Sequence, residues 1–250
     1  MNLSRYIRHY MKNPLVLGTF LLTASGVLSR IIGFFYRIFL SHTIGAEGIG
    51  IYQLIFPLLA LCSSFTTAGI QTAISKFVAE VSDDQNESRR RCYLAAGLLL
   101  SLSLSFLCAF YLYTQADFLA YHVIHEYRTA PLLRILAYSL PFGAIHSCIS
   151  GYYYGLKKAM IPSVSQLIEQ IVRVASVYVI YRVQMQEQIP VTPAIAVWGI
   201  VCGEISSALF SAAAVRFSPY AGACRRTPQQ GFVSHLSTAL HLPGFCHLPS

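Results

Sequence analysis

Charged side chains are scarce in this sequence: Lys, Arg, Asp and Glu make up 11% of its 250 residues, and only 10 residues are acidic. An average soluble domain carries roughly 25% charged residues. Hydrophobic residues instead reach 55%, and the mean hydropathy is +0.54. This shortage of charge argues against a soluble domain and predicts an all-α integral membrane protein.

The sequence also lacks the usual motifs of catalysis. It contains neither a Walker loop nor a G-x-S-x-G elbow. His122 and His125 lie in a predicted outer loop without the glutamate of an H-E-x-x-H arrangement. The odd total of seven cysteines argues against a disulfide framework. We therefore predict no cofactor, no resident metal and no enzymatic activity.

Runs of about 20 apolar residues predict transmembrane helices, because a helix rises 1.5 Å per residue and the hydrocarbon core is about 30 Å thick. The first run is too long for a signal peptide and contains Arg30. Six runs are predicted to span the membrane: 15–40, 49–75, 92–116, 130–156, 161–181 and 189–215.

The distribution of Lys and Arg predicts the orientation. With six spans, both termini share one side with the loops after the second and fourth spans, whereas the other side holds only Arg128 and Arg182. By the positive-inside rule both termini are cytoplasmic. The net charge of +8 then reflects topology rather than a nucleic-acid-binding face. The basic residues of the cytoplasmic side are Arg5, Arg8, Lys12, Lys76, Arg89, Arg90, Arg91, Lys157, Lys158, Arg216, Arg225 and Arg226.

Three regions follow from this pattern. Residues 1–14 form a basic cytoplasmic N-terminus, and residues 15–217 form a lobe of six transmembrane helices. Residues 218–250 are an irregular tail rich in proline, cysteine and histidine. The tail has no paired Cys-x-x-Cys, which argues against a zinc site. Disorder and a change of reading frame near Phe217 are both open explanations, and the coding DNA would distinguish them.

Arg30 and Arg37 are the first candidate site. They are seven residues apart, so they lie about 10.5 Å apart along a helix and only about 20° apart around it, with Gly33 between them. A charge at this depth costs about 2.5 to 3.5 kcal/mol. Guanidinium groups bind phosphate oxygens bidentately, so the three residues predict a diphosphate site. Alternatively, Arg37 snorkels to the headgroups and Arg30 pairs with a carboxylate on another helix.

The fifth span carries a polar stripe at helical spacing, which must face the bundle interior or a water-filled cavity. Its members are Gln166, Glu169, Gln170, Arg173 and Ser176. Glu169 and Arg173 also have the spacing of a simple ion pair within one helix. Glu204, in the sixth span, is a candidate for neutralising Arg30 or Arg37, or for ion or proton coupling. Gln166, Glu169, Arg173 and Glu204 are therefore candidate cavity or coupling residues.

Several segments resemble one family of membrane proteins. The run S-R-I-I-G-F at 29–34, then Arg37, and I-G-A-E-G-I-G-I-Y-Q at 44–53 are similar to the first helix and first outer loop of polysaccharide-biosynthesis flippases. The segment 68–76 fits the same pattern. The resemblance covers about 13–217. It is closest to the stage V sporulation protein B branch, which is related to the lipid II flippases of the multidrug/oligosaccharidyl-lipid/polysaccharide exporter superfamily.

The resemblance implies a two-lobe exporter in the bacterial cytoplasmic (inner) membrane, with about six helices in each lobe and alternating access through a cationic cavity. The implied substrate is an undecaprenyl-diphosphate-linked saccharide. Arg30 matches a position that is an essential arginine in lipid II flippases. Arg37 is displaced by one residue from their second arginine, and the aspartate that follows it is absent here. Only the N-terminal lobe is matched, so a second lobe or another copy is an expected partner, besides membrane lipids.

Three other functions are weighed against this one. A cation-coupled multidrug exporter of the same superfamily should have an acidic cavity, whereas the predicted spans hold more arginines than acids. A truncated, non-functional fragment is a second possibility. A membrane enzyme acting on lipid-linked sugars would need an acid/base pair near one interface, and Asp117 and Glu126 are its only acidic candidates.

Overall fold

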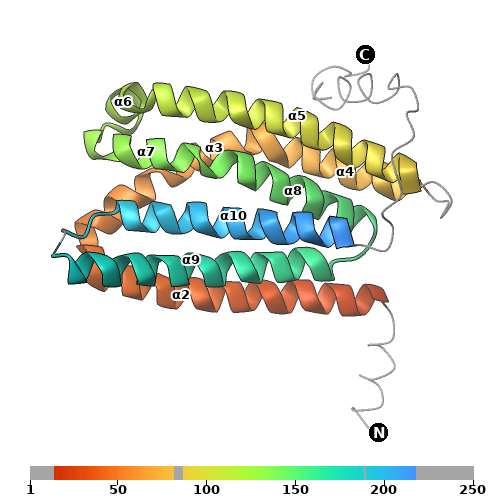
Figure 1. Ribbon diagram of the computed structural model, residues 1–250, viewed down its shortest axis with the longest axis horizontal. Helices are drawn as coiled ribbons and strands as arrows, with labels where there is room; N and C mark the ends of the chain where they lie inside the picture. Colours follow the sequence, from red (N-terminus) through yellow and green to blue (C-terminus); the bar gives the residue numbers. More distant parts are fainter. Residues whose placement is uncertain (1–13, 82–86, 189, 218–250) are drawn as a thin grey trace, which may run out of the picture.

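The computed structural model describes residues 14–81, 87–188 and 190–217, and these residues form helices without any strand (Figure 1). The predicted tail 218–250 and nearly all of the N-terminal region lie outside the described residues. The α-helices are α2 (Pro14–Leu54), α3 (Phe56–Ser63), α4 (Gly69–Glu80), α5 (Glu87–Thr114), α6 (Ala116–Leu119), α7 (Ala130–Ala137), α8 (Ser139–Gly155), α9 (Met160–Gln186) and α10 (Ala194–Phe217). Three short helical segments of other types are η1 (Ser64–Ala68), η3 (Ala120–Ile124) and η4 (Tyr127–Thr129).

The first two predicted spans, 15–40 and 49–75, are joined by helical structure in place of the short outer loop expected between them. Helical structure continues through Leu54, and the break falls at Gly45, whose φ of 74° and ψ of 173° lie outside the helical region. A residue with a side chain rarely adopts this conformation, so glycine is needed at the turn. Figure 1 shows the result: α2 runs along the bundle in one direction, and α3 and α4 run back along it.

Three described helical segments are long and apolar enough to cross a membrane: 19–80, α5 and α10. A fourth is obtained if α7 and α8, which meet at a bend of 48°, form one span. The segment 19–80 has 62 residues, or about 93 Å of helix, which is more than one crossing of a core about 30 Å thick. α9 is not among these candidate spans, because its polar stripe lowers its hydropathy. The prediction of an all-helical membrane protein is thus supported by the structure.

The long helices lie roughly side by side along the bundle (Figure 1). α10 packs extensively on both α8 and α9, while α8 and α9 contact each other much less. α2 packs on α9, and α4 packs on α8 and α5. The space between α8 and α9 is therefore backed by α10, with α4 packed beside α8 and α2 packed on α9.

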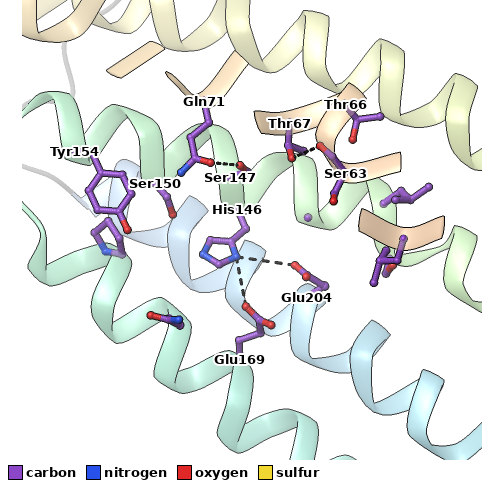
Figure 2. Close-up of a pocket in the computed structure, with 16 residues that line it drawn as sticks. Ser63, Thr66, Thr67, Gln71, His146, Ser147, Ser150, Tyr154, Glu169 and Glu204 are labelled. Carbon is purple, nitrogen blue, oxygen red and sulfur yellow. Dashed lines mark hydrogen bonds and ion pairs between the residues drawn. The ribbon is translucent and has the colours of Figure 1, made fainter. Parts of the chain in front are cut away.

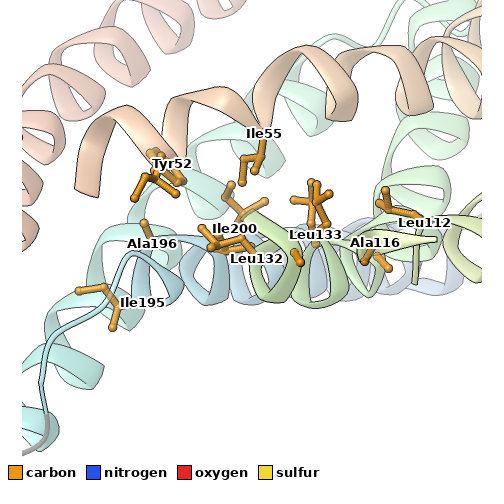
Figure 3. Close-up of a cluster of buried hydrophobic side chains, with 14 of the residues drawn as sticks. Tyr52, Ile55, Leu112, Ala116, Leu132, Leu133, Ile195, Ala196 and Ile200 are labelled. Atoms are coloured by element: carbon orange, nitrogen blue, oxygen red, sulfur yellow. The ribbon is translucent and has the colours of Figure 1, made fainter. Parts of the chain in front are cut away.

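Two hydrophobic clusters hold the bundle together. The larger one joins α2 and the short helices to α5, α7, α9 and α10, and its fully buried members include Ile55, Ala116 and Leu133 (Figure 3). The smaller one joins α4, α5 and α8 around Ile74 and Cys148. Many other large apolar side chains are exposed, as expected of helices that face lipid.

Two glycines allow α8 to approach α4 closely. A Cβ atom on Gly151 would lie 2.6 Å from the carbonyl oxygen of Gln71, and one on Gly155 would lie 2.7 Å from that of Ser75. The two glycines are four residues apart and so form a small-xxx-small pair, which is typical of close helix crossings in membranes. The opposing atoms belong to the backbone, which leaves no room for a side chain.

A second glycine pair does the same for α10 and α9. A Cβ atom on Gly199 would lie 3.2 Å from the carbonyl oxygen of Arg173, and one on Gly203 would lie 3.0 Å from that of Glu169. This crossing sets the distance between the polar stripe of α9 and the residue that follows Gly203, which is Glu204.

We expect Gly155→Val to destabilise the bundle, because the added side chain would meet the backbone of α4. Overpacking of this kind costs about 1 to 3 kcal/mol. Thermal unfolding of the detergent-solubilised chain should show the loss. Gly26→Val is the matched control, since a Cβ atom there meets nothing within 4 Å. Equal melting temperatures for the two variants would contradict the expectation.

Candidate functional site

A pocket of about 350 Å³ opens in the space between α8 and α9. Its walls come from α3, η1, α4, α8, α9 and α10 (Figure 2). Most of its lining side chains are hydroxyls and amides, which is unusual for helices with this apolar composition. They include Ser63, Thr66, Thr67, Gln71, Ser147, Ser150 and Gln166.

Local hydrogen bonding explains how hydroxyl groups are accommodated on the α3–α4 wall. Ser63, Thr66 and Thr67 each donate to a carbonyl oxygen of the preceding turn, at 2.7 to 3.0 Å. The chain forms a π-helical turn at η1, a feature that is frequent at functional sites. Ser101 donates to the carbonyl oxygen of Thr66 at 2.6 Å. With their protons used internally, these hydroxyl oxygens can still accept hydrogen bonds from a ligand.

A histidine and two glutamates converge at the floor of the pocket. His146 comes from α8, Glu169 from α9 and Glu204 from α10, and Figure 2 shows the imidazole facing both carboxylates. Nδ1 of His146 lies 3.7 Å from Oε2 of Glu169 and 3.9 Å from Oε2 of Glu204. Ser207 lies 3.1 Å from the same nitrogen through its Oγ. The three ionisable side chains are between 12% and 23% exposed, so they are poorly hydrated.

Arg173 approaches the same cluster from α9. It forms an ion pair with Oε1 of Glu169, so the within-helix pair that the spacing suggested is present. The two oxygens of Glu169 therefore have different surroundings, since Oε1 faces Arg173 and Oε2 faces His146. Of the predicted cavity residues, Gln166, Glu169 and Glu204 line one pocket, and Arg173 contacts one of them.

Arg30 and Arg37 lie on α2, and their side chains are exposed and outside this pocket. A Cβ atom on Gly33 would meet nothing within 4 Å, so the space between the two arginines is open. Neither arginine forms an ion pair within the described ranges, so the alternative in which Arg30 pairs with a carboxylate is not seen there. Glu204 faces His146 instead of either arginine.

The charges near the predicted outer surface are paired with one another. Arg134 binds Asp117 at 2.6 Å, and Arg128 forms an ion pair with Glu47. A hydrogen bond with the Tyr127 hydroxyl, and then the contact with Glu47, raise the pKa of Arg128 above its ordinary value. Glu126 accepts a hydrogen bond from the backbone N–H of Arg128. The two acids considered for an enzyme thus have structural partners.

The sequence itself places the chain among known proteins. The family model for polysaccharide biosynthesis proteins matches residues 15–242. The chain belongs to the polysaccharide biosynthesis protein family. Stage V sporulation protein B of Bacillus subtilis (strain 168) is 31% identical over 201 residues, which cover 80% of this chain and 38% of the relative.

A second relative carries a more specific name. Lipid II flippase MurJ of Bacillus subtilis (strain 168) is 29% identical over 178 residues, which cover 66% of this chain and 32% of the relative. The chain therefore spans between about a third and two fifths of the length of these two proteins. No solved structure is significantly similar to the chain.

His146 is the site residue in this family member that the sequence interpretation missed. It lies within the predicted fourth span, where an ionisable side chain is itself a signal of function. No periodic partner on α8 draws attention to it. The hydroxyl groups of the α3–α4 wall were missed as well, because serine and threonine are common in transmembrane helices.

We expect Arg173→Met to lower the free energy of unfolding by about 3 to 5 kcal/mol, because it leaves the Glu169 carboxylate buried without its counter-ion. The double variant Arg173→Met, Glu169→Met removes both charges and should be more stable than the single variant. Thermal unfolding in detergent measures both. If the double variant is no more stable than Arg173→Met, the unpaired Glu169 carboxylate costs nothing and the expectation is wrong.

Proposed function

We propose that the chain is a six-span lobe of a flippase for a lipid-linked oligosaccharide or a peptidoglycan or polysaccharide precursor. In this proposal both termini are cytoplasmic and the lobe lies in the bacterial cytoplasmic membrane. In this proposal segment 19–80 supplies two crossings, α5, the bent pair of α7 and α8, and α10 supply three more, and α9, which is not among the candidate spans by its hydropathy, supplies the sixth. The family match and the name of the lipid II flippase relative support the proposal.

The observation that carries the proposal is the state of Arg30 and Arg37. Both guanidinium groups are exposed on one flank of α2, and neither forms an ion pair among the described residues. Arginines left unpaired at this depth are costly unless something anionic meets them. The diphosphate of an undecaprenyl-linked saccharide has the charge and the oxygen geometry to do so, and the open space at Gly33 allows it to approach.

The pocket suits the saccharide end of such a substrate. Its hydroxyl oxygens can accept hydrogen bonds from sugar hydroxyls, and its amide side chains can both accept and donate them. Tyr154 adds an aromatic surface. α9 contributes to the wall of the pocket and also packs against α2, the helix that carries Arg30 and Arg37. In the proposal, a second lobe or another copy of this chain closes the pocket from the opposite side, as alternating access requires.

A cation-coupled exporter is the second candidate, because Glu169 and Glu204 line the pocket whereas none of the four intramembrane arginines does. These acids would favour a cationic substrate or ion inside the pocket. The two candidates differ in which charges bind the cargo, so charge-removing variants separate them.

We expect Arg30→Ala to weaken binding of an undecaprenyl-diphosphate-linked disaccharide by about 10- to 100-fold, which is the loss of one charge-assisted interaction worth about 1.5 to 3 kcal/mol. Arg30→Lys should recover part of the affinity, since it keeps the charge and loses the bidentate geometry. Fluorescence titration of the purified chain with the labelled lipid measures both.

The control for this test is Arg216→Ala, which removes an exposed arginine from the C-terminal end of α10. Affinity should not change there. The proposal fails if Arg30→Ala binds the lipid as the wild type does. In a full-length family member, the same substitution should also prevent complementation of a flippase-depleted strain.

Binding of a monovalent organic dye cation tests the second candidate. An exporter of cations should bind the dye with an affinity that falls at least about tenfold in Glu204→Gln, since one carboxylate is lost from a poorly hydrated pocket. A flippase lobe should show no such dependence. Dye binding that requires Glu204, together with lipid binding that does not require Arg30, would favour the exporter.

A further inference from the structure

His146, Glu169 and Glu204 direct three ligand-type atoms at one point inside the bundle. A ring nitrogen and two carboxylate oxygens lie within 4.8 Å of one another, and no other such group of three occurs among the described residues. The three side chains come from α8, α9 and α10, so helix packing holds them in place. Gly203 contributes directly, because it allows the backbone of Glu169 to approach α10 next to Glu204.

The spacing of these atoms is informative. Nδ1 of His146 is 3.7 Å and 3.9 Å from the two carboxylate oxygens, which is longer than the 2.7 to about 3.2 Å of a hydrogen bond. Two ligands of one metal ion, each bound at about 2.1 Å in tetrahedral geometry, are about 3.4 Å apart. The two separations are beyond hydrogen-bond range and a few tenths of an ångström longer than those of atoms that share an ion, so small side-chain movements would bring the three groups around a metal ion.

The charges of the cluster favour a cation. With both carboxylates ionised and His146 neutral, the guanidinium of Arg173 leaves one net negative charge in a poorly hydrated region, which is costly inside a membrane. Oε2 of Glu204 is buried and has no hydrogen-bond partner in the described structure. A bound cation would satisfy both this oxygen and the excess charge.

Binding of the cation needs the Nδ1 lone pair of His146, and the Ser207 hydroxyl occupies that nitrogen in this structure. Oγ of Ser207 lies 3.1 Å from Nδ1 and 3.0 Å from the carbonyl oxygen of Glu204. Because the carbonyl oxygen offers the hydroxyl another acceptor, a cation can displace Ser207 from Nδ1 while the imidazole keeps its proton on Nε2. Arg173, on the other oxygen of Glu169, fixes that carboxylate in the way outer-shell partners of metal ligands do.

We infer that His146, Glu169 and Glu204 bind a divalent transition-metal ion, for which Zn²⁺ is the best match. Zn²⁺ accepts imidazole nitrogen and carboxylate oxygen together, whereas Mg²⁺ and Ca²⁺ prefer oxygen ligands alone. Three protein ligands leave a fourth position, and the adjoining pocket gives a water molecule or another ligand access to it. The site includes neither Arg30 nor Arg37, so loss of diphosphate binding would leave it intact.

Zn²⁺ titration of the full chain tests the inference. The protein is purified in detergent through a tag without histidine, stripped with a chelator, and titrated with ZnCl₂ in a calorimeter. The wild type should bind one Zn²⁺ at this site. Glu204→Gln and His146→Asn should each weaken that binding by at least about 100-fold, because even outer-shell changes cost about 10- to 100-fold. Co²⁺ should give the visible absorption bands of a tetrahedral site in the wild type only.

Two controls address adventitious binding and misfolding. His122→Asn with His125→Asn removes an exposed pair of histidines, and the tight site should remain. Zn²⁺ should raise the melting temperature of the wild type but not of the Glu204 and His146 variants, and Mg²⁺ should raise neither. If the wild type binds Zn²⁺ no more tightly than Glu204→Gln and His146→Asn, the cluster holds a proton instead, and the inference is wrong.

Discussion

The close crossing of α9 and α10 is the constraint on which the rest of the site depends. Gly199 and Gly203 expose the backbone of α10, so α9 approaches until its carbonyl oxygens meet the glycine faces. Lipid supplies no hydrophobic force between helices, and such a crossing is stabilised by the packing that small residues permit. Because Glu204 follows Gly203 directly, the same contact that joins the helices also brings Glu204 to Glu169 and to the floor of the pocket.

The polar side chains around the pocket are stable in the bundle because most of them form hydrogen bonds or ion pairs with one another or with their own helix. Hydroxyls on the α3–α4 wall donate to their own helix, Gln71 accepts a hydrogen bond from Ser147, and Arg173 pairs with Glu169. Such internal bonding allows polar side chains to remain in an apolar bundle without being exposed to lipid. The exception is Oε2 of Glu204, which has no hydrogen-bond partner among the described residues and lies 3.9 Å from His146.

Acidic and basic side chains lie in different places. Glu169 and Glu204 line the pocket, whereas Arg30 and Arg37 lie outside it on α2 with open space between them. The matched part of the chain corresponds to 32% of the length of the lipid II flippase relative. The proposed diphosphate site on α2 and the inferred metal site in the pocket are thus separate in space and in chemistry.

The sequence by itself determined the helical membrane character, the family, the polar stripe of α9 and the shared face of Arg30 and Arg37, because composition and helical periodicity are local properties. It also suggested the pairing of Glu169 with Arg173, since both lie on one helix. It did not reveal the helical join at Gly45, the glycine crossings or the role of His146. Only the tertiary structure placed His146 beside Glu169 and Glu204, because these residues lie on three different helices and meet only where glycine lets the backbones approach.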